Sequence, residues 1–347
     1  IVLENEDYAD TYVNNKNPWL GTKLQRRGTL LTKYYGTGHV SLDNYISMVS
    51  GQAPNPATSS DCQNYGNFNG TTNKAAIGPN GQAIGSGCVY PTNVKTLADQ
   101  LSKRHISWAG YMDQMGNTPS REQRRCGIPT LTNSGLDDTQ TATAADQYAA
   151  RHNPFVYFHS VIDSGRCKRH VVPLTFLPKA LKRVKTTPRF AFITPDLCND
   201  GHDKPCTGKD ARGSNAGGLV SVDHFLSTWI PRIKHSKAYR KNGLIIITSD
   251  ESTTSDATSC CNEQPGPSDP LPGISGPGGG RVGALVLGHC VRRGARDPVP
   301  YNHYALLRSL EDLYRVHHGG SDRRGHLGYA GVAGLRPFGR DLFARCR

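Results

Sequence analysis

Short apolar runs alternate with helix-like repeats along this chain. The runs are rich in β-favouring residues and predict buried strands. Between them, apolar residues recur every three or four positions, as in helices that bury one face. The predicted strands occupy residues 1–3, 30–35, 106–112, 190–194, 244–248 and 282–287. This alternation of strands and helices is typical of a mostly parallel sheet.

The helical pattern is clearest in four segments, residues 38–51, 94–101, 222–233 and 303–314. Pro231 predicts a kink or an end near the last turn of the third helix, because proline removes a backbone donor. An alanine-rich stretch at 142–149 predicts one more helix. We find no internal repeat and no linker, and therefore expect one catalytic domain over residues 1–347, of α/β class, with large loop insertions.

Ten cysteines are present without a C-x-x-C pair or a Cys/His zinc pattern. An even number of cysteines, mostly in loops, favours disulfides and an oxidising compartment over metal binding. We expect Cys62–Cys88 and Cys198–Cys206 bridges, because each would close a loop rich in Gly, Asn or Asp. The protein is therefore expected to be secreted, with its signal segment absent from this chain.

The charge balance favours anionic partners. Lys and Arg number 41 against 28 Asp and Glu, which gives a net charge of +13. A basic surface attracts phosphates, nucleic acids or anionic membranes. No recognition helix, zinc finger or RNA-binding motif accompanies the charge, so nucleic acid is not the expected partner. Peripheral contact with an anionic membrane stays open, and no apolar run is long enough to span one.

The segment from Gly38 to Gly51 combines a tight entry, a hydroxyl group and an amphipathic helix. Ser41 would lie at the helix N-terminus, where free backbone N–H groups and the helix dipole favour an anion such as phosphate. Asn44 falls in the same turn, and His39 lies just outside it. A serine at this position is also the commonest helix cap, so the segment alone does not decide between a cap and a nucleophile.

Acidic residues follow two of the apolar strands. Glu4 and Asn5 end the first, and Asp250 and Glu251 end the run LIIIT. In open α/β sheets the carboxyl ends of the strands assemble the site. Clustered carboxylates repel one another unless a cation lies between them. With Ser41, these oxygen ligands favour one divalent ion, Ca²⁺ or Mg²⁺, with Mn²⁺ or Zn²⁺ as alternatives.

Four histidines lie near the same predicted edge: His39, His152, His202 and His303. Each could bind a phosphate oxygen or protonate a leaving group. His202 and His303 are the preferred acids, because His202 stands beside Asp203 in a loop after a strand and His303 opens a helix. Other catalytic classes lack their motifs: there is no G-x-S-x-G elbow, no Walker A sequence and no dinucleotide fingerprint.

These residues fall within motifs that resemble the phosphoesterase family, which holds bacterial acid phosphatases and phospholipases C of the alkaline-phosphatase-like superfamily. In order, the motifs are IVLENEDY, GHVSLDNY, RHNPFVYF, TPDLCNDGHD, IIITSDES and NHYALLRSLEDLY. The chain is most similar to compact secreted acid phosphatases that resemble the mycobacterial phosphoinositide phosphatase. The resemblance implies an alkaline-phosphatase-like fold, with a mostly parallel central sheet flanked by helices on both faces and long disulfide-stapled loops.

The resemblance also implies roles for individual residues. Ser41 matches the nucleophile, with Glu4 and Asn5 as the opening metal-binding pair and Asp250 with Glu251 as the later pair. The family often has proline immediately before the nucleophile and two residues after it, and Val40 and Asp43 stand there in this chain.

The remaining matches concern the substrate. His152 matches the histidine of the H-N-P motif, His202 with Asp203 the G/M-H-D segment, and His303 the late histidine. We expect His152, His39, Asn44 and Asp203 to contact the substrate, and His152 and Asn44 to assist catalysis.

The implied function is that of a secreted, metal-dependent phosphomonoesterase that acts through a phosphoserine. Phosphorylated small molecules, phosphoinositides among them, or phospholipid head groups are the expected partners. Two alternatives stay open: a phospholipase C-type phosphodiesterase that uses the same residues, and a non-catalytic anion-binding protein on the same scaffold.

Overall fold

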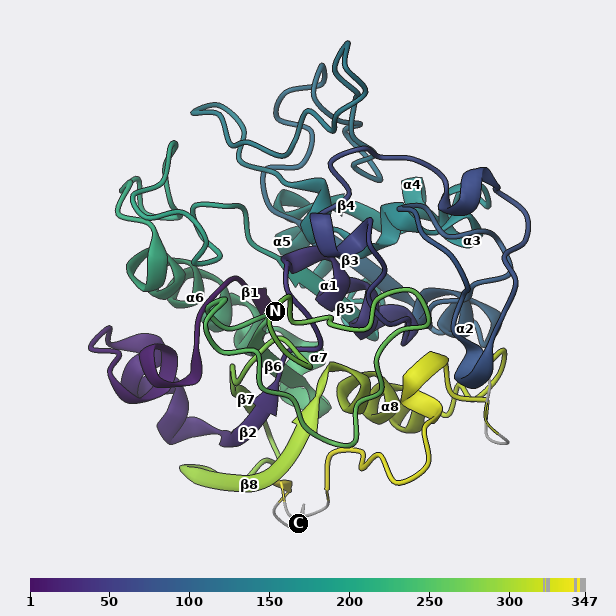
Figure 1. Cartoon of the computed structure of the whole chain (residues 1–347). Coiled ribbons are helices and arrows are strands. Elements are labelled where there is room, and N and C mark those ends of the chain that lie inside the picture. Colours follow the sequence, from purple (N-terminus) through teal and green to yellow (C-terminus); the bar gives the residue numbers. More distant parts are fainter. Residues whose placement is uncertain (321, 323–324, 340–341, 344–347) are drawn as a thin grey trace.

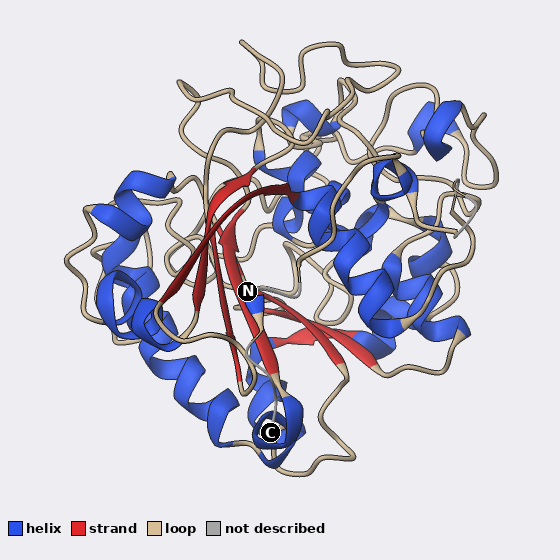
Figure 2. Ribbon diagram, turned by 90° about the horizontal axis from the view of Figure 1, so that it is seen from below, coloured by secondary structure: helices blue, strands red, loops and turns tan. Residues whose placement is uncertain are grey.

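Two sheets form the centre of the protein, and helices cover both faces (Figures 1 and 2). The computed structural model describes residues 1–320, 322, 325–339 and 342–343. The strands are β1 (Val2–Leu3), β2 (Thr29–Tyr35), β3 (Trp108–Met112), β4 (Val171–Pro173), β5 (Phe190–Thr194), β6 (Leu244–Ser249), β7 (Ala284–Gly288) and β8 (Ala295–Asn302). The helices are α1 (Ser41–Ser50), α2 (Leu97–Lys103), α3 (His159–Ile162), α4 (Arg166–His170), α5 (Leu177–Ala180), α6 (Gly218–His235), α7 (Lys237–Asn242) and α8 (His303–Tyr314).

The sheets are rich in parallel pairs, as predicted. The five-stranded sheet has the order β1-β6-β7-β2-β8, and the three-stranded sheet has the order β4-β3-β5. Strand β7 is antiparallel to both β6 and β2, whereas the other pairs between named strands are parallel. Because β7 alone is reversed, β1, β6, β2 and β8 all point the same way, and their carboxyl ends share one edge.

Successive side chains of a strand in the five-stranded sheet pack into two separate hydrophobic cores, one on each face of the sheet. On β7, Ala284 and Val286 join the core that contains α1, α2 and α8, whereas Leu285 and Leu287 join the core beneath α6. Successive side chains of a strand point to opposite faces, so an unbroken apolar run is the pattern of a strand buried on both sides. Helices α1 and α6 therefore cover opposite faces of the five-stranded sheet.

The helix α1 is buried along its whole length. It begins at Ser41, directly after the extended Val40, and ends at Gly51, which adopts the left-handed conformation with φ 68°. Glycine takes this conformation without a steric penalty and is the usual residue after a helix end. The limits predicted from the sequence are confirmed.

One local prediction is wrong. The segment around Ala142–Ala149 is not helical, since its Asp146 carboxylate accepts the backbone N–H groups of Thr118 and Tyr148. Such bonds give the backbone an alternative to helix formation. Pro231 lies in the last turn of helix α6, which ends at His235, four residues beyond the proline. The apolar face of this helix is buried, and this burial outweighs the loss of one hydrogen bond.

Both predicted disulfides are present. Cys62–Cys88 staples the loop after α1, and Cys198–Cys206 closes the loop after β5. Cys126–Cys167 and the adjacent pair Cys260–Cys261 are bridged as well. Among the described residues, no helix is both long and apolar enough to cross a membrane.

Candidate active site

The residues that follow the parallel strands converge at the shared sheet edge. Glu4 follows β1 and Asp250 follows β6, while Ser41 opens the helix reached from β2. Backbone hydrogen bonds join these strand ends: Asp250 N donates to Leu3 O, and Glu4 N donates to Asp200 O, each at 2.9 Å. Asp200 lies in the loop after β5, so this second bond joins the two sheets at the site.

Ser41 and Glu4 are in direct contact. The Ser41 hydroxyl donates a 2.7 Å hydrogen bond to Glu4 Oε2, and the Tyr45 hydroxyl donates to Glu4 Oε1. Ser41 and Tyr45 lie four residues apart on α1 and therefore face the same side of the helix. The two hydroxyl groups therefore donate hydrogen bonds to the same carboxylate, that of Glu4, which is fully buried.

A tight turn places Ser41 at the helix start. Asn44 Oδ1 accepts the backbone N–H groups of Thr37 and Gly38 at 2.7 and 3.1 Å, and Asn44 Nδ2 donates to Gly38 O at 2.9 Å. A Cβ on Gly38 would lie 2.5 Å from Asp43 Oδ2, so only glycine fits there. The Asn44 amide thus organises the turn between β2 and α1.

Asp61 occupies part of the helix N-terminus. Its Oδ1 accepts the backbone N–H of Leu42 at 2.9 Å, and its Oδ2 lies 3.6 Å from Arg151 Nε. A carboxylate is stabilised at the positive end of a helix dipole, and here a buried guanidinium balances it. No motif in the sequence distinguishes either residue.

His152 lies between two carboxylates. Its Nε2 is 3.3 Å from Glu4 Oε2, and its Nδ1 is 3.3 Å from Asp200 Oδ2. The ring stacks on Tyr45 with centroids 5.4 Å apart and planes inclined by 11°. Neither contact has hydrogen-bond geometry, although both ring nitrogens are buried. Burial holds the pKa of His152 well below its usual value, so the ring is neutral.

The carboxyl groups of the site resist ionisation. Burial raises the pKa of Glu4 well above its usual value, and the charges of Asp250 and Asp200 raise it further. Burial likewise raises the pKa of Asp200 to about 8 and that of Asp250 to about 7. Three buried acids at one point are electrostatically unfavourable unless protons or a cation compensate their charge.

The donor set fits a divalent cation. Glu4, His152 and Asp200 each offer one ligand atom, and the three atoms lie within 4.8 Å of one another. Asp200 Oδ2 and Asp250 Oδ2 have no hydrogen-bond partner among the described residues, although both are buried. Unpartnered buried carboxylate oxygens are costly, and coordination of an ion would remove that cost.

The other predicted metal ligands lie differently. Asn5 is exposed, and its backbone N–H donates to Asp250 Oδ1 at 3.1 Å. Glu251 Oε2 contacts His39 Nδ1, and His39 Nε2 lies 3.2 Å from Asp256 O. Burial lowers the pKa of His39. The structure thus brings together Glu4, Ser41 and Asp250 of the predicted set, and pairs Glu251 with His39.

The two preferred acids have different surroundings. His202 Nδ1 contacts Asp203 Oδ1 at 2.7 Å, and this hydrogen bond raises the pKa of His202. The side chain is 31% exposed, and its ring centroid lies 6.2 Å from that of His152. His303 is fully buried, with Nε2 2.5 Å from Asp250 O and Nδ1 3.0 Å from the Tyr34 hydroxyl. Burial lowers the pKa of His303 to about 4.

Asp200 is the main residue of the cluster that was not predicted from the sequence. It lies in the quoted motif TPDLCNDGHD between two other acids, Asp196 and Asp203. Asp196 accepts hydrogen bonds from Cys198 N and Asn199, so it shapes the loop instead. The backbone contact of Asp200 with Glu4 and its side-chain contact with His152 distinguish it, and both contacts are tertiary.

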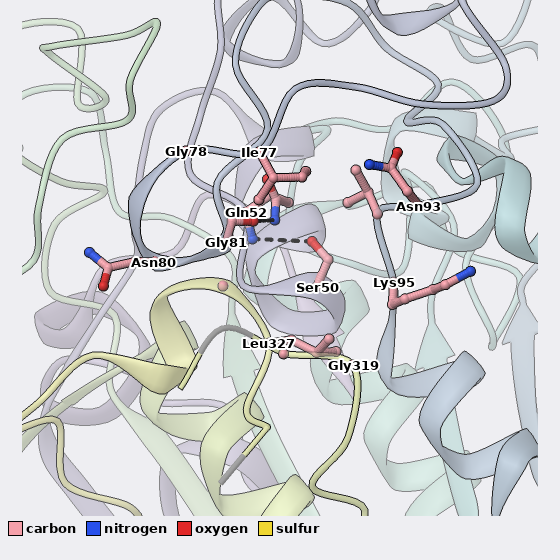
Figure 3. Close-up of a pocket in the computed structure, with 13 residues that line it drawn as sticks. Ser50, Gln52, Ile77, Gly78, Asn80, Gly81, Asn93, Lys95, Gly319 and Leu327 are labelled. Atoms are coloured by element: carbon pink, nitrogen blue, oxygen red, sulfur yellow. Dashed lines mark hydrogen bonds between the residues drawn. The ribbon is translucent and has the colours of Figure 1, made fainter. Parts of the chain in front are cut away.

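A separate cavity lies at the far end of α1 (Figure 3). It encloses about 300 Å³ and is lined by Ser50, Gln52 and Lys95 among others. None of the predicted site residues lines it. Because Ser50 is the last residue of α1 and Ser41 the first, the cavity and the carboxylate cluster are at opposite ends of this helix.

Comparisons with known proteins agree with the resemblance seen in the sequence. The model of the Phosphoesterase family matches residues 8–317. An "Acid phosphatase" from Aspergillus fumigatus is 24% identical over 313 residues, which cover 89% of this chain and 53% of that protein. A "Phosphate-repressible acid phosphatase" from Penicillium chrysogenum is 26% identical over 313 residues, 89% of this chain and 57% of that protein. The chain thus spans little more than half the length of these relatives.

A solved structure supports the fold. A protein in the alkaline phosphatase superfamily from Vibrio parahaemolyticus superposes with a TM-score of 0.51 at 14% identity, over 98% of this chain and 70% of that one. The alkaline-phosphatase-like architecture expected from the motifs is therefore confirmed at the level of the fold.

Proposed function

Since this chain belongs to the Phosphoesterase family, we propose that it hydrolyses phosphate monoesters with Ser41 as the nucleophile. One observation carries the proposal: the Ser41 hydroxyl stands at the start of a buried helix and donates to Glu4 within a cluster of buried acids. Val40 is the N-cap residue of α1 and Ser41 is the first helical residue, so Ser41 does not occupy the capping position.

The chain's own groups suit each step of the reaction. With the charge of the buried acids compensated, Glu4 is ionised, and its Oε2 receives the Ser41 proton as Oγ attacks phosphorus, because the two atoms are already hydrogen-bonded. The nearby helix N-terminus favours the charge on the phosphoryl oxygens. His202 protonates the leaving oxygen, since it is the partly exposed histidine whose pKa is raised by a carboxylate. Water then hydrolyses the phosphoserine.

Glu4, Asp200, Asp250 and His152 would hold one divalent ion. When bound, such an ion would neutralise negative charge on the buried carboxylates and on the phosphate of the substrate. The carboxylate-rich set suits Mg²⁺, Ca²⁺ or Mn²⁺, and the imidazole of His152 also suits Zn²⁺. In this proposal Asn44 organises the turn before Ser41, and His303 supports the backbone carbonyl of Asp250.

The substrate class follows from charge and from the relatives. The net charge of +13 favours anionic phosphorylated small molecules, phosphoinositides among them, and favours contact with an anionic membrane surface. Two relatives named as acid phosphatases support monoester hydrolysis. The disulfides support an extracellular location.

The decisive experiment compares wild type, Ser41→Ala and Ser50→Ala on p-nitrophenyl phosphate and on a phosphorylcholine diester. We expect Ser41→Ala to lower turnover by about 10³-fold or more, with Ser50→Ala close to wild type. Near-normal turnover by Ser41→Ala would reject the nucleophile. If the wild-type protein hydrolyses the diester faster than p-nitrophenyl phosphate, the phosphodiesterase alternative is favoured. Saturable lipid binding without turnover of either substrate would favour the non-catalytic binding protein.

A further inference from the structure

A second cluster of metal-ligating side chains lies where α8 ends. Arg315 adopts a left-handed conformation with φ 53° and turns the chain back on the helix. This reversal brings His317 Nε2 to 2.9 Å from Asp312 Oδ1. The helix end alone therefore pairs a carboxylate with an imidazole.

A third side chain reaches the same oxygen from further along the chain. The Leu327 N–H donates to Glu311 Oε1 at 3.0 Å, which ties the segment after His326 to α8. His326 is fully buried, and its Nε2 lies 3.0 Å from Asp312 Oδ1. The His317 and His326 rings have centroids 4.7 Å apart. One carboxylate oxygen thus faces two imidazole nitrogens.

The other nitrogen of His326 also faces a carboxylate. His326 Nδ1 lies 2.7 Å from Asp322 Oδ2, and the His326 backbone N–H donates to Asp322 Oδ1 at 2.7 Å. A neutral imidazole carries a single N–H, so it can donate to Asp322 or to Asp312 but not to both. A cation at the Nε2 side would give the nitrogen that carries no N–H a partner.

We propose that Asp312, His317 and His326 bind a divalent transition-metal ion of the Zn²⁺ type, separate from the Ser41 site. Their ligand atoms lie within 4.8 Å of one another. Asp312 Oδ1 lies 2.9 Å from His317 Nε2 and 3.0 Å from His326 Nε2. These distances are close to the roughly 3.3 Å that separates neighbouring ligand atoms around a tetrahedral ion with bonds of about 2.05 Å. His326 Nδ1–H donates to Asp322, which is the usual outer partner of a ligating histidine.

Two imidazoles and one carboxylate favour a borderline ion over Mg²⁺ or Ca²⁺. Water fills the fourth position. The ion joins α8 to the loop that contains His317 and His326. The same loop supplies Gly319, Gly320 and Leu327 to the wall of the 300 Å³ cavity, so metal binding stabilises that wall (Figure 3).

The test measures metal stoichiometry in the full chain. Chelator-treated protein is dialysed against Co²⁺ or Zn²⁺, and bound metal per chain is determined for wild type, His317→Ala, Asp312→Asn and the control His289→Ala, an exposed histidine elsewhere. We expect both cluster variants to bind one ion fewer than wild type, and His289→Ala to bind as wild type does. Asp322→Asn should keep the ion but bind it about 10 to 100 times more weakly.

Thermal unfolding gives an independent readout. Zn²⁺ should raise the melting temperature of the Glu4→Gln protein, in which the Ser41 site is impaired, and this rise should disappear when His317→Ala is added. Phosphatase activity of His317→Ala should stay near wild type, so the result is independent of the proposed function. Equal metal content in wild type, His317→Ala and Asp312→Asn would overturn the proposal.

Discussion

The hydroxyl of Ser41 donates a 2.7 Å hydrogen bond to Glu4, across 37 positions of sequence. The serine opens α1, and the glutamate follows β1 at the edge of the five-stranded sheet. This contact connects a helix N-terminus with a cluster of buried acids. It is the geometry from which the proposed phosphoryl transfer follows.

The first prediction concerns Glu4 and the cation. Glu4→Gln keeps the shape of the side chain but removes the acceptor of the Ser41 proton and one ligand, so we expect turnover to fall by about 10²-fold or more. Steady-state kinetics and metal analysis measure the effect. Asp7→Asn is the control, because its side-chain oxygen still caps Asp10 N.

Chelation extends the same prediction. Thorough removal of divalent ions should abolish turnover of the wild type, and added Mg²⁺, Ca²⁺, Mn²⁺ or Zn²⁺ should restore it. Asp200→Asn should require a higher ion concentration for the same recovery. Unchanged activity after chelation would reject the assignment of a cation to this cluster.

The second prediction tests the proton donor. His202→Ala should slow hydrolysis of an alkyl phosphate by about 10²-fold or more, and of p-nitrophenyl phosphate far less, because nitrophenolate leaves without protonation. His224→Ala is a matched control, because it also removes a histidine that contacts an aspartate. His224 lies 2.6 Å from Asp210, and His202 lies 2.7 Å from Asp203. Equal losses on the two substrates would count against His202 as the acid.

The third prediction concerns the turn before α1. Gly38→Ala places a methyl group 2.5 Å from Asp43 Oδ2. Relief of this clash must displace Asp43 or the turn, so we expect a loss of about 1–3 kcal/mol in unfolding free energy and a lower kcat. Urea denaturation and kinetics measure both. Gly66→Ala, whose nearest contact would be 3.7 Å, should behave as wild type.

The fourth prediction is a pH dependence away from the site. Burial, followed by the charge of Asp146, raises the pKa of Glu122 to about 8. Between about pH 4.5 and 8 the folded state holds a proton that the unfolded chain has released, so stability falls as pH rises through this range.

Glu122→Gln should flatten this decline between pH 5 and 8, because an amide does not titrate. Its oxygen can still accept the Gly116 N–H, which Glu122 Oε1 accepts at 2.7 Å. Urea denaturation at several pH values provides the measurement. Parallel curves for variant and wild type would show that Glu122 is not the group responsible.

Local sequence was sufficient for α1 and for most strands of the sheets. The repeat of Leu42, Ile46 and Val49 and the stop at Gly51 are properties of neighbouring residues, and they predicted the helix that carries Ser41. Unbroken apolar runs predicted β5, β6 and β7, because these strands have cores on one or both faces.

Strand β8 escaped prediction. Its sequence, ARDPVPYN, contains two prolines and charged residues. It lies at the edge of the sheet beside β2, where the missing N–H groups of proline do not interrupt a central ladder. Neighbouring strands, and not local propensity, hold it in the sheet.

Sequence motifs by themselves identified the segments of the candidate site: the strand end at Glu4, the helix start at Ser41, the acidic pair at Asp250 and the loop around His202. Tertiary structure decided which side chains meet. Asp200 reaches Glu4 through a backbone bond between the two sheets, and His303 is buried against Asp250 O. The reason is physical: desolvation and proximity, which set the pKa and the contacts of each group, depend on residues far apart in the chain.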